Sequence, residues 1–250
     1  MKKTEIERII DELNEIRLYS MAAALGELFR SKHFDTMDRI EMLEQIIGPE
    51  YEAKTSKQYE NRLKRARLIG GPQTVDSCKD SSERLYLPSG IVETLVSMDF
   101  IKEGLNVCIL GPSDSGKSYL AKAIGIQACL RYRVSYHHCE SFLEELVALK
   151  TRDYQKFQKK VLHFINMDLL ILDDFLLHTI TDEREIKVLF EVLEKRSELA
   201  KSTIVCSQRE PKSWATMILN DEVSSNAIMK RATKHYTVVI AQGLILRTAF

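Results

Sequence analysis

The chain has 250 residues, of which 44% are hydrophobic, and its 36 basic residues are balanced by 36 acidic ones. This length suits one domain of ordinary size together with a smaller one. A zero net charge excludes a global field that attracts nucleic acid, so any nucleic-acid surface has to be local.

The sequence shows neither a membrane segment nor a secretory leader. It contains no run of 18 or more apolar residues, and its beginning, MKKTEIERIIDEL, is charged throughout. The five cysteines form no CxxC pair, which is typical of free thiols in a reducing compartment. We therefore expect a cytoplasmic protein that has no membrane partner.

Residues 1–69 have the pattern of a small helical domain that binds DNA or a protein partner. Residues 4–29 carry apolar side chains at three- and four-residue intervals, the spacing of one helix face. A second helix is expected from about Asp35 to Gly48-Pro49, where the proline favours a stop, and a third over residues 51–68.

The third predicted helix is basic. Its sequence, YEAKTSKQYENRLKRARL, carries six basic residues and two acidic ones, which leaves a net charge of +4. At 3.6 residues per turn, four of the basic residues share one stripe about 100° wide. They are Lys54, Lys57, Lys64 and Arg65. Two interpretations stay open, a solvated helix face or phosphate contacts on double-stranded DNA.

The segment 70–98 is expected to be a linker and a lead-in helix. It opens with GGPQTVDSCKDSS, whose glycines, proline and small polar residues break both the helical and the strand periodicity.

Residues 99–250 have the pattern of an α/β domain. Short β-branched runs alternate with helical stretches, which predicts a parallel five-stranded sheet with helices on both faces. The predicted strands are 106–110, 133–138, 169–175, 202–208 and 236–241.

The first of these strands leads into a glycine-rich phosphate loop. The loop reads GPSDSGKS, and a helix follows at once. Gly111 and Gly116 permit the turns that aim backbone N–H groups at phosphates, Lys117 reaches the β- and γ-phosphates, and Ser118 offers its hydroxyl to Mg²⁺. This context predicts binding of ATP or GTP. The nucleotide-contacting residues are Gly111, Pro112, Ser113, Asp114, Ser115, Gly116, Lys117 and Ser118.

One residue of this loop is unusual. Asp114 stands at the fourth position, where many such loops have glycine, and its carboxylate would oppose a polyphosphate. Asp tolerates positive φ better than most residues. We therefore expect weaker nucleotide binding, unless this side chain turns to solvent.

Two acidic residues end the third predicted strand, LLILDDF. Asp173 has the position of a carboxylate that holds Mg²⁺, and Asp174 follows it near the attacking water. An acidic strand end without function is the plain alternative. Because the phosphate loop lies about 60 residues upstream, the paired pattern favours hydrolysis over binding alone.

Two further residues are candidates for the hydrolytic step. Gln208, at the end of the fourth strand, could orient the same water or be a solvated loop residue. Arg231, just before the last strand, could reach the γ-phosphate of a neighbouring subunit as an arginine finger.

The order of these motifs resembles that of the IstB-like ATP-binding proteins, the helper subunits of bacterial insertion-sequence transposition. The resemblance rests on GPSDSGKS, LLILDDF, STIVCSQREPKSW and a helical N-terminal region that ends in NRLKRARL. These helpers belong to the AAA+ ATPases and are related to the DnaC-type helicase loaders.

The resemblance implies a P-loop AAA+ fold in which the third predicted strand lies beside the first and the fourth. Only about nine residues follow the last predicted strand, so we expect no C-terminal lid domain. It implies ATP and Mg²⁺ as cofactors, a homo-oligomer that assembles with ATP on DNA, and a partner transposase encoded by the same element. In this comparison Gln208 matches a first sensor, Arg231 the finger and Arg247 a second sensor. The sequence departs from the family at Asp114 and at LILR near its end, where Ser-Met-Arg is usual.

Two other functions are compatible with a phosphate loop of this kind. A DnaC-type helicase loader would share the ATPase residues and use its N-terminal domain to bind a helicase. A metabolic P-loop kinase would need a small-substrate pocket and a lid, of which the sequence shows no sign.

Overall fold

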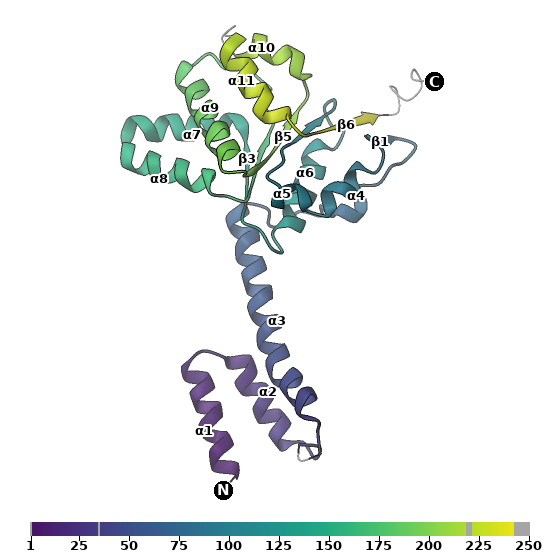
Figure 1. The fold of residues 1–250 in the computed structure, drawn as a ribbon, viewed down its shortest axis with the longest axis vertical. Coiled ribbons are helices and arrows are strands. Elements are labelled where there is room, and N and C mark those ends of the chain that lie inside the picture. Colours follow the sequence, from purple (N-terminus) through teal and green to yellow (C-terminus); the bar gives the residue numbers. More distant parts are fainter. Residues whose placement is uncertain (1, 35, 219–221, 243–250) are drawn as a thin grey trace. The chain divides into compact units, whose positions relative to one another are not determined.

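The computed structural model describes residues 2–34, 36–218 and 222–242, and the chain divides into two compact units, 1–61 and 62–250 (Figure 1). This division falls inside a helix, eight residues before the domain border that we predict at 69/70. Among the described residues, no helix has both the length and the apolar character to cross a membrane.

The N-terminal unit consists of helices. Their bounds are α1 (Lys2–Glu15), α2 (Tyr19–Arg30) and α3 (Arg39–Ala66), of which α3 continues into the second unit. The apolar stripe over 4–29 is therefore interrupted. Arg17 has a left-handed φ of 63°, and the N–H groups of Arg17 and Leu18 bond back to the carbonyls of Asn14 and Leu13. This pair of bonds is the Schellman motif that ends a helix.

The predicted helix end at Gly48-Pro49 is wrong, because α3 runs through this dipeptide without a break. The physical reason lies in the next residue. Glu50 is buried, and its carboxylate accepts hydrogen bonds from the N–H groups of Ser20 (2.8 Å) and Met21 (3.1 Å) at the start of α2. Glu50 thus caps α2 from a neighbouring helix, a tertiary interaction that outweighs the local preference of proline.

The second unit contains a six-stranded sheet in the order β1-β6-β2-β5-β4-β3. The strands are β1 (Arg84–Leu87), β2 (Val107–Leu110), β3 (Val134–His138), β4 (Leu169–Asp173), β5 (Ser202–Ser207) and β6 (Tyr236–Gln242). The five predicted strands are all present and parallel. The sixth, β1, pairs antiparallel with β6 at the edge of the sheet, within the segment that we expected to be a linker and a helix.

The third predicted strand lies beside the fourth, as expected, but the expectation that it also lies beside the first is wrong. This strand, β4, lies between β5 and β3, and β5 separates it from β2. The phosphate loop and the acidic pair therefore follow strands that are two positions apart in the sheet.

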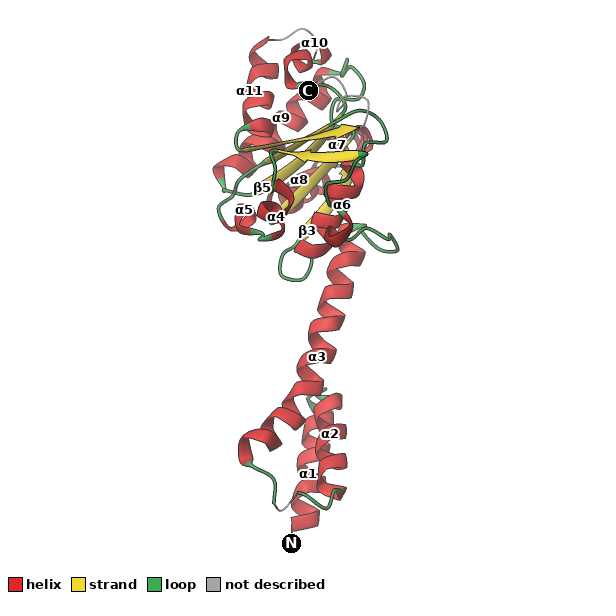
Figure 2. Ribbon diagram, turned by 90° about the vertical axis from the view of Figure 1, so that its right-hand side faces the viewer, coloured by secondary structure: helices red, strands yellow, loops and turns green. Residues whose placement is uncertain are grey.

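Helices cover both faces of the sheet (Figure 2). The helical elements of this unit are α4 (Ile91–Val96), α5 (Asp99–Lys102), α6 (Lys117–Ala128), α7 (Cys139–Arg152), α8 (Tyr154–Ile165), α9 (Glu183–Glu198), α10 (Trp214–Met217), α11 (Glu222–Thr233) and two short 3₁₀ turns, Val75–Ser77 and Pro211–Ser213. On one face, Gly125 of α6 lies against Ile171 and Val134. On the other, Leu170 and Leu172 share a buried cluster with residues of α7, α8, α9 and α11. Because strand side chains alternate between faces, both faces of these strands are buried.

Candidate nucleotide-binding site

The phosphate loop lies between β2 and α6, at the carboxyl edge of the parallel strands. Gly116 has a φ of 97° and caps α6 at its N-terminus. A Cβ on Gly111 would lie 2.6 Å from Ser115 Oγ and 3.0 Å from the Ile240 carbonyl oxygen, so a larger residue would require both neighbours to shift. The loop therefore has the tight turns that aim backbone N–H groups at an anion.

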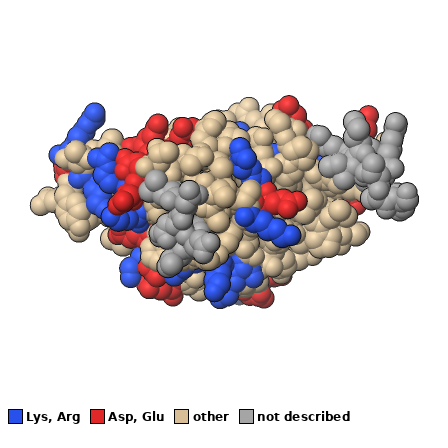
Figure 3. All heavy atoms as spheres, turned by 90° about the horizontal axis from the view of Figure 1, so that it is seen from above, with Lys and Arg blue, Asp and Glu red and all other residues tan. Residues whose placement is uncertain are grey.

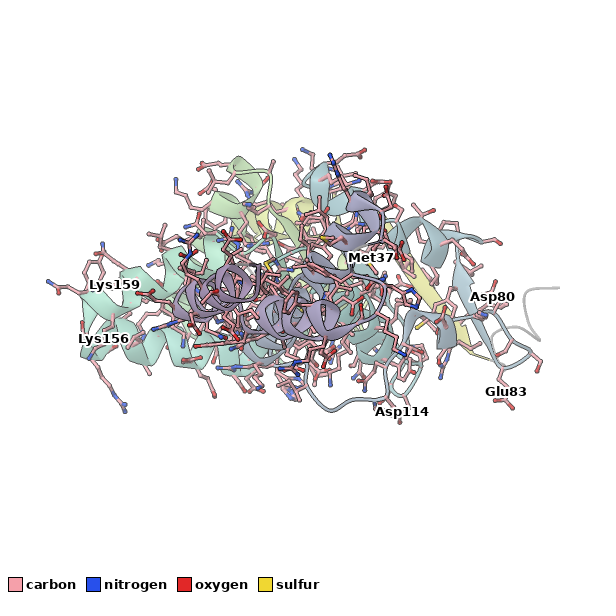
Figure 4. All side chains as sticks on the ribbon, turned by 90° about the horizontal axis from the view of Figure 1, so that it is seen from below. Met37, Asp80, Glu83, Asp114, Lys156 and Lys159 are labelled. Carbon is pink, nitrogen blue, oxygen red and sulfur yellow. The ribbon has the colours of Figure 1, made fainter. Side chains whose placement is uncertain are left out.

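Asp114 lies on the outside of this loop. It has a left-handed φ of 59°, its side chain is exposed, and Figure 4 shows it at the periphery, pointing away from the body of the protein. The residue thus occupies a position that suits glycine, with its carboxylate in solvent. Solvent screening weakens the repulsion that this charge would exert on a phosphate.

Lys117 is buried inside the loop, with 5% of its surface exposed. Its Nζ donates a hydrogen bond to the Pro112 carbonyl oxygen at 2.5 Å. Burial lowers the pKa of Lys117, and the negative charges of Asp173, Asp174 and Asp114 oppose this change. Asp173 and Asp174, which end β4, thus lie close enough to the loop lysine for their charges to act on it.

Asp173 is fully buried at the end of β4. Its Oδ2 accepts a hydrogen bond from the Tyr136 hydroxyl at 2.5 Å, and its Oδ1 accepts one from the Asp174 N–H at 3.1 Å. Burial raises the pKa of Tyr136, and the hydrogen bond to Asp173 raises it further. The ammonium of Lys122, on α6, lies 4.8 Å from the centre of the Tyr136 ring.

Tyr136 is a site residue that our sequence reasoning missed. The available signal was its place in the predicted strand 133–138, since β3 pairs in parallel with β4 and His138 lies opposite Asp173. A residue two positions before His138 projects from the same face of the sheet.

Asp174 has a different environment from Asp173. It has a φ of 52°, and its Oδ2 lies 3.0 Å from His138 Nδ1, with both side chains partly exposed. Asp174 and His138 line a cavity of about 240 Å³, whose lining also includes His178 and Glu185. A partly exposed carboxylate beside a cavity can contact water, whereas the buried Asp173 is already held by two donors.

Strand β5 lies between the loop strand and the acidic strand. The Cys206 thiol donates a hydrogen bond to the Lys117 carbonyl oxygen at 4.0 Å. Burial raises the pKa of this thiol most, and the negative charge of Asp173 raises it further. Gln208 is exposed immediately after the end of this strand. The fold therefore places Gln208 at the same edge of the sheet as the loop and the acidic pair.

Arg231 does not lie at this edge. Its guanidinium donates to Glu194 Oε1 at 2.8 Å and covers the Phe190 ring at 4.8 Å, both on α9. Its carbonyl oxygen accepts from Asn106, which precedes β2 at the opposite edge of the sheet. Arg231 is thus separate from the phosphate loop of its own chain. Arg247 lies outside the described residues.

The four basic residues of the predicted stripe are all exposed on α3, Lys54 and Lys57 in the first unit and Lys64 and Arg65 in the second. Lys54 forms a 3.5 Å ion pair with Glu50. A further basic residue of this helix, Arg62, is bound elsewhere, because it donates to the carbonyl oxygens of Cys129 and Leu130 at the end of α6. On the face of the protein drawn in Figure 3, Lys and Arg are interspersed with Asp and Glu.

The residues present fit a magnesium nucleotide. The Ser115 hydroxyl is fully buried in the loop and has no hydrogen-bond partner among the described residues. Ser118 starts α6 beside Lys117, and Asp173 supplies a carboxylate, so the available ligands are the oxygens that Mg²⁺ prefers. The glycines leave room for phosphate oxygens, and the helix N-terminus favours an anion.

Comparison with known proteins agrees with this geometry. The sequence profile of the family described as IstB-like ATP binding protein matches residues 11–248. An insertion-sequence ATP-binding protein of Sinorhizobium fredii, y4pL, is 30% identical over 95% of this chain and 95% of its own length. The ATP-binding protein of insertion sequence IS232 from Bacillus thuringiensis subsp. berliner is 25% identical over 96% of this chain and 94% of its own.

Solved structures share the fold of about seven tenths of this chain. AMPPCP-bound DnaA from Aquifex aeolicus has a TM-score of 0.57 at 21% identity and covers 72% of this chain and 55% of that one. The DnaC helicase loader has a TM-score of 0.52 at 20% identity and covers 70% of this chain and 99% of that one. The fold is thus that of an α/β P-loop AAA+ protein.

Proposed function

Because the chain belongs to the family of IstB-like ATP-binding proteins, we propose that it is an Mg²⁺-dependent ATPase that binds double-stranded DNA and stimulates a transposase encoded by the same insertion sequence. It does so as a homo-oligomer that assembles with ATP. The proposed domain organisation is a DNA- or partner-binding region (1–69), a connecting segment (70–98) and the ATPase domain (99–250).

One observation carries the ATPase part of this proposal. The buried Lys117 follows β2 at the edge of the sheet where Asp173 and Asp174 follow β4, and β5 alone separates the two strands, although these residues are more than 50 positions apart in the sequence. A lysine inside a glycine-lined loop, with two carboxylates of different exposure nearby, is the arrangement that phosphoryl transfer to water needs.

The roles follow from the environments. Lys117 leaves the Pro112 carbonyl and donates to phosphate oxygens, while the backbone N–H groups of the loop bind the remaining oxygens. Asp174 accepts a proton from the attacking water, which Gln208 orients. Ser118 and Asp173 would hold Mg²⁺, which when bound supplies positive charge against the phosphate oxygens.

Arg231 completes the site of a neighbouring copy in this proposal. Its guanidinium is paired with Glu194 in the single chain, so it has to leave this carboxylate before it can reach a phosphate in trans. The nucleotide site and the finger then lie at opposite edges of the sheet, which is compatible with a head-to-tail contact between identical subunits.

The DNA-binding part rests on the exposed basic residues of α3. Neutralising Lys54, Lys57, Lys64 and Arg65 together is expected to weaken duplex binding and to reduce the slope of log K against log salt by about 0.9 for each phosphate that the variant no longer neutralises. A control with the same charge change elsewhere is provided by exposed lysines of α8 and α9. They are Lys156, Lys159, Lys187 and Lys195.

A DnaC-type helicase loader is the second candidate. The likeness to the DnaC loader concerns the fold, whereas the family profile extends over both units. We therefore favour the transposition helper.

The test of the function is strand transfer by the purified transposase on duplex target DNA. Addition of this protein with ATP is expected to raise the yield, and the Lys117→Ala variant, which loses the loop cation, is expected not to. Capture of a replicative helicase, with no effect on strand transfer, would support the loader instead.

A further inference from the structure

A second cation lies against the phosphate loop, on the edge strand β1. The Cζ and Nη1 atoms of Arg84 are each 3.1 Å from the point that a Cβ on Gly116 would occupy, and Nη2 is 3.4 Å from it. The flat end of this guanidinium therefore faces the glycine that caps α6, one residue before Lys117.

The backbone of Arg84 is held in place from two sides. In the sheet it pairs with Gln242, and its N–H and carbonyl exchange hydrogen bonds with Ser81 across a tight turn, at 3.3 and 2.8 Å. Two residues on, the Tyr86 N–H donates to Asp80 Oδ1 at 2.8 Å. The arginine thus extends from a fixed strand end, and its position at the loop needs no rearrangement of the main chain.

The guanidinium has no ion-pair partner among the described carboxylates, and its Nε is buried without a hydrogen bond. Figure 4 shows the neighbouring Glu83 at the periphery of the protein, as it does Asp114. Burial raises the pKa of Tyr86, and the neighbouring Arg84 opposes that rise, first through a hydrogen bond and then through its positive charge. A partly buried guanidinium that has no described carboxylate as its ion-pair partner is a suitable ligand for a phosphate group, which it can bind with two N–H groups.

From this geometry we propose that Arg84 binds a phosphate group of the nucleotide, as a second cation of the site beside Lys117. The inference rests on the proposed nucleotide site. It also assigns a role to the strand β1, which brings the arginine to the loop. The charge of Arg84 offsets the extra negative charge that Asp114 adds to this loop.

The test measures affinities of the full chain for ATP and for inorganic tripolyphosphate, which has the phosphates but no base. Arg84→Ala is expected to weaken both ligands by about ten- to a hundredfold, the range for a charged hydrogen bond. Arg131→Ala, an exposed arginine after α6, is the matched control and is expected to change neither.

Tripolyphosphate binding of Arg84→Ala at the wild-type level would overturn the proposal, whether or not ATP binding falls, because an effect on ATP alone would indicate a contact with the base. If Arg84→Ala fails to fold, Arg84→Gln keeps the stem and a hydrogen-bond donor without the charge, and the same expectations apply. Failure of the nucleotide site itself has a different signature, namely a wild-type chain that binds neither ligand or a Lys117→Ala variant that binds both normally.

Discussion

Replacement of Arg196 by alanine is expected to destabilise the second unit (62–250) strongly. Arg196 is a fully buried arginine on α9, and burial lowers its pKa to about 9, so it stays charged at neutral pH. Its guanidinium donates to the carbonyl oxygens of Phe164 (2.6 Å) and Met167 (2.8 Å) at the end of α8, and to Thr203 Oγ1 (3.0 Å) on β5. It also bonds to the Ser202 carbonyl oxygen.

The size of the effect follows from these bonds. Alanine would leave several buried acceptors without donors, each of which costs about 1–3 kcal/mol unless water reaches it. With partial rehydration of the α8 end, we expect a loss of about 4 kcal/mol, a large part of the roughly 5–15 kcal/mol that stabilises a typical domain. Arg196→Lys keeps the charge and up to three donors, so its loss should be smaller.

The assay is urea unfolding followed by the fluorescence of Trp214. This residue is the single tryptophan of the chain and is fully buried beside Phe175, so it reports on the second unit. Lys195→Ala, the exposed neighbour on the same helix, is the control and should stay within about 0.5 kcal/mol of the wild type. A loss below about 1 kcal/mol in Arg196→Ala would refute the reasoning, because the buried acceptors would then not depend on the guanidinium.

Three further predictions concern single residues. Asp174→Asn should bind ATP normally but hydrolyse it about a hundredfold or more slowly, and unchanged turnover would assign Asp174 another role. Burial lowers the pKa of His137 to about 4, so as the pH falls the imidazole is protonated in the unfolded chain before it is protonated in the folded protein. Wild-type stability should therefore drop by about 3 kcal/mol more than that of His137→Gln between pH 6.5 and 4, and parallel pH profiles in urea unfolding would contradict this. Glu50→Ala should lower the free energy of local opening at the Ser20 and Met21 amides by roughly 0.5–2 kcal/mol, the contribution of a helix cap, and their hydrogen exchange should become faster accordingly. Exchange rates equal to those of the wild type would show that the cap contributes nothing.

The sequence alone predicts much of the α/β fold of the second unit, because its parallel strands are buried on both faces and their sequences are continuous apolar runs. The short edge strand β1 escapes such reasoning. It has four residues, of which only Tyr86 is buried, and its partner β6 lies about 150 residues further on. The sequence does not predict the strand order either, because the apolar patterns of β2 and β4 would be the same whether or not β5 lay between them.

In the helical unit the local signals are misleading in both directions. Gly48-Pro49 looks like a helix end but lies inside α3, because Glu50 is held by the start of α2. The sequence around Arg17 has a helical pattern, yet α1 ends there because Arg17 adopts a left-handed conformation. Arginine has no preference for that conformation, so the residue type gives no sign of the helix end.

For the candidate site, spacing in the sequence is informative about the loop and the acidic pair, and uninformative about their partners. The hydrogen bond from Tyr136 to Asp173 depends on the register of β3 against β4, and the pairing of Arg231 with Glu194 depends on the packing of α11 against α9. Both are tertiary contacts between segments that carry no shared motif.

The proposed ATPase depends most on one Mg²⁺ ion that Ser118 and Asp173 bind together. A crystal structure of the protein with a non-hydrolysable ATP analogue and Mn²⁺ in place of Mg²⁺ would locate it by anomalous scattering. We predict one manganese peak bound by the Ser118 hydroxyl and a phosphate oxygen, with the Asp173 carboxylate either bound directly or joined through one water. A nucleotide bound elsewhere, or an ion at this nucleotide without contact to either residue, would contradict the proposed site.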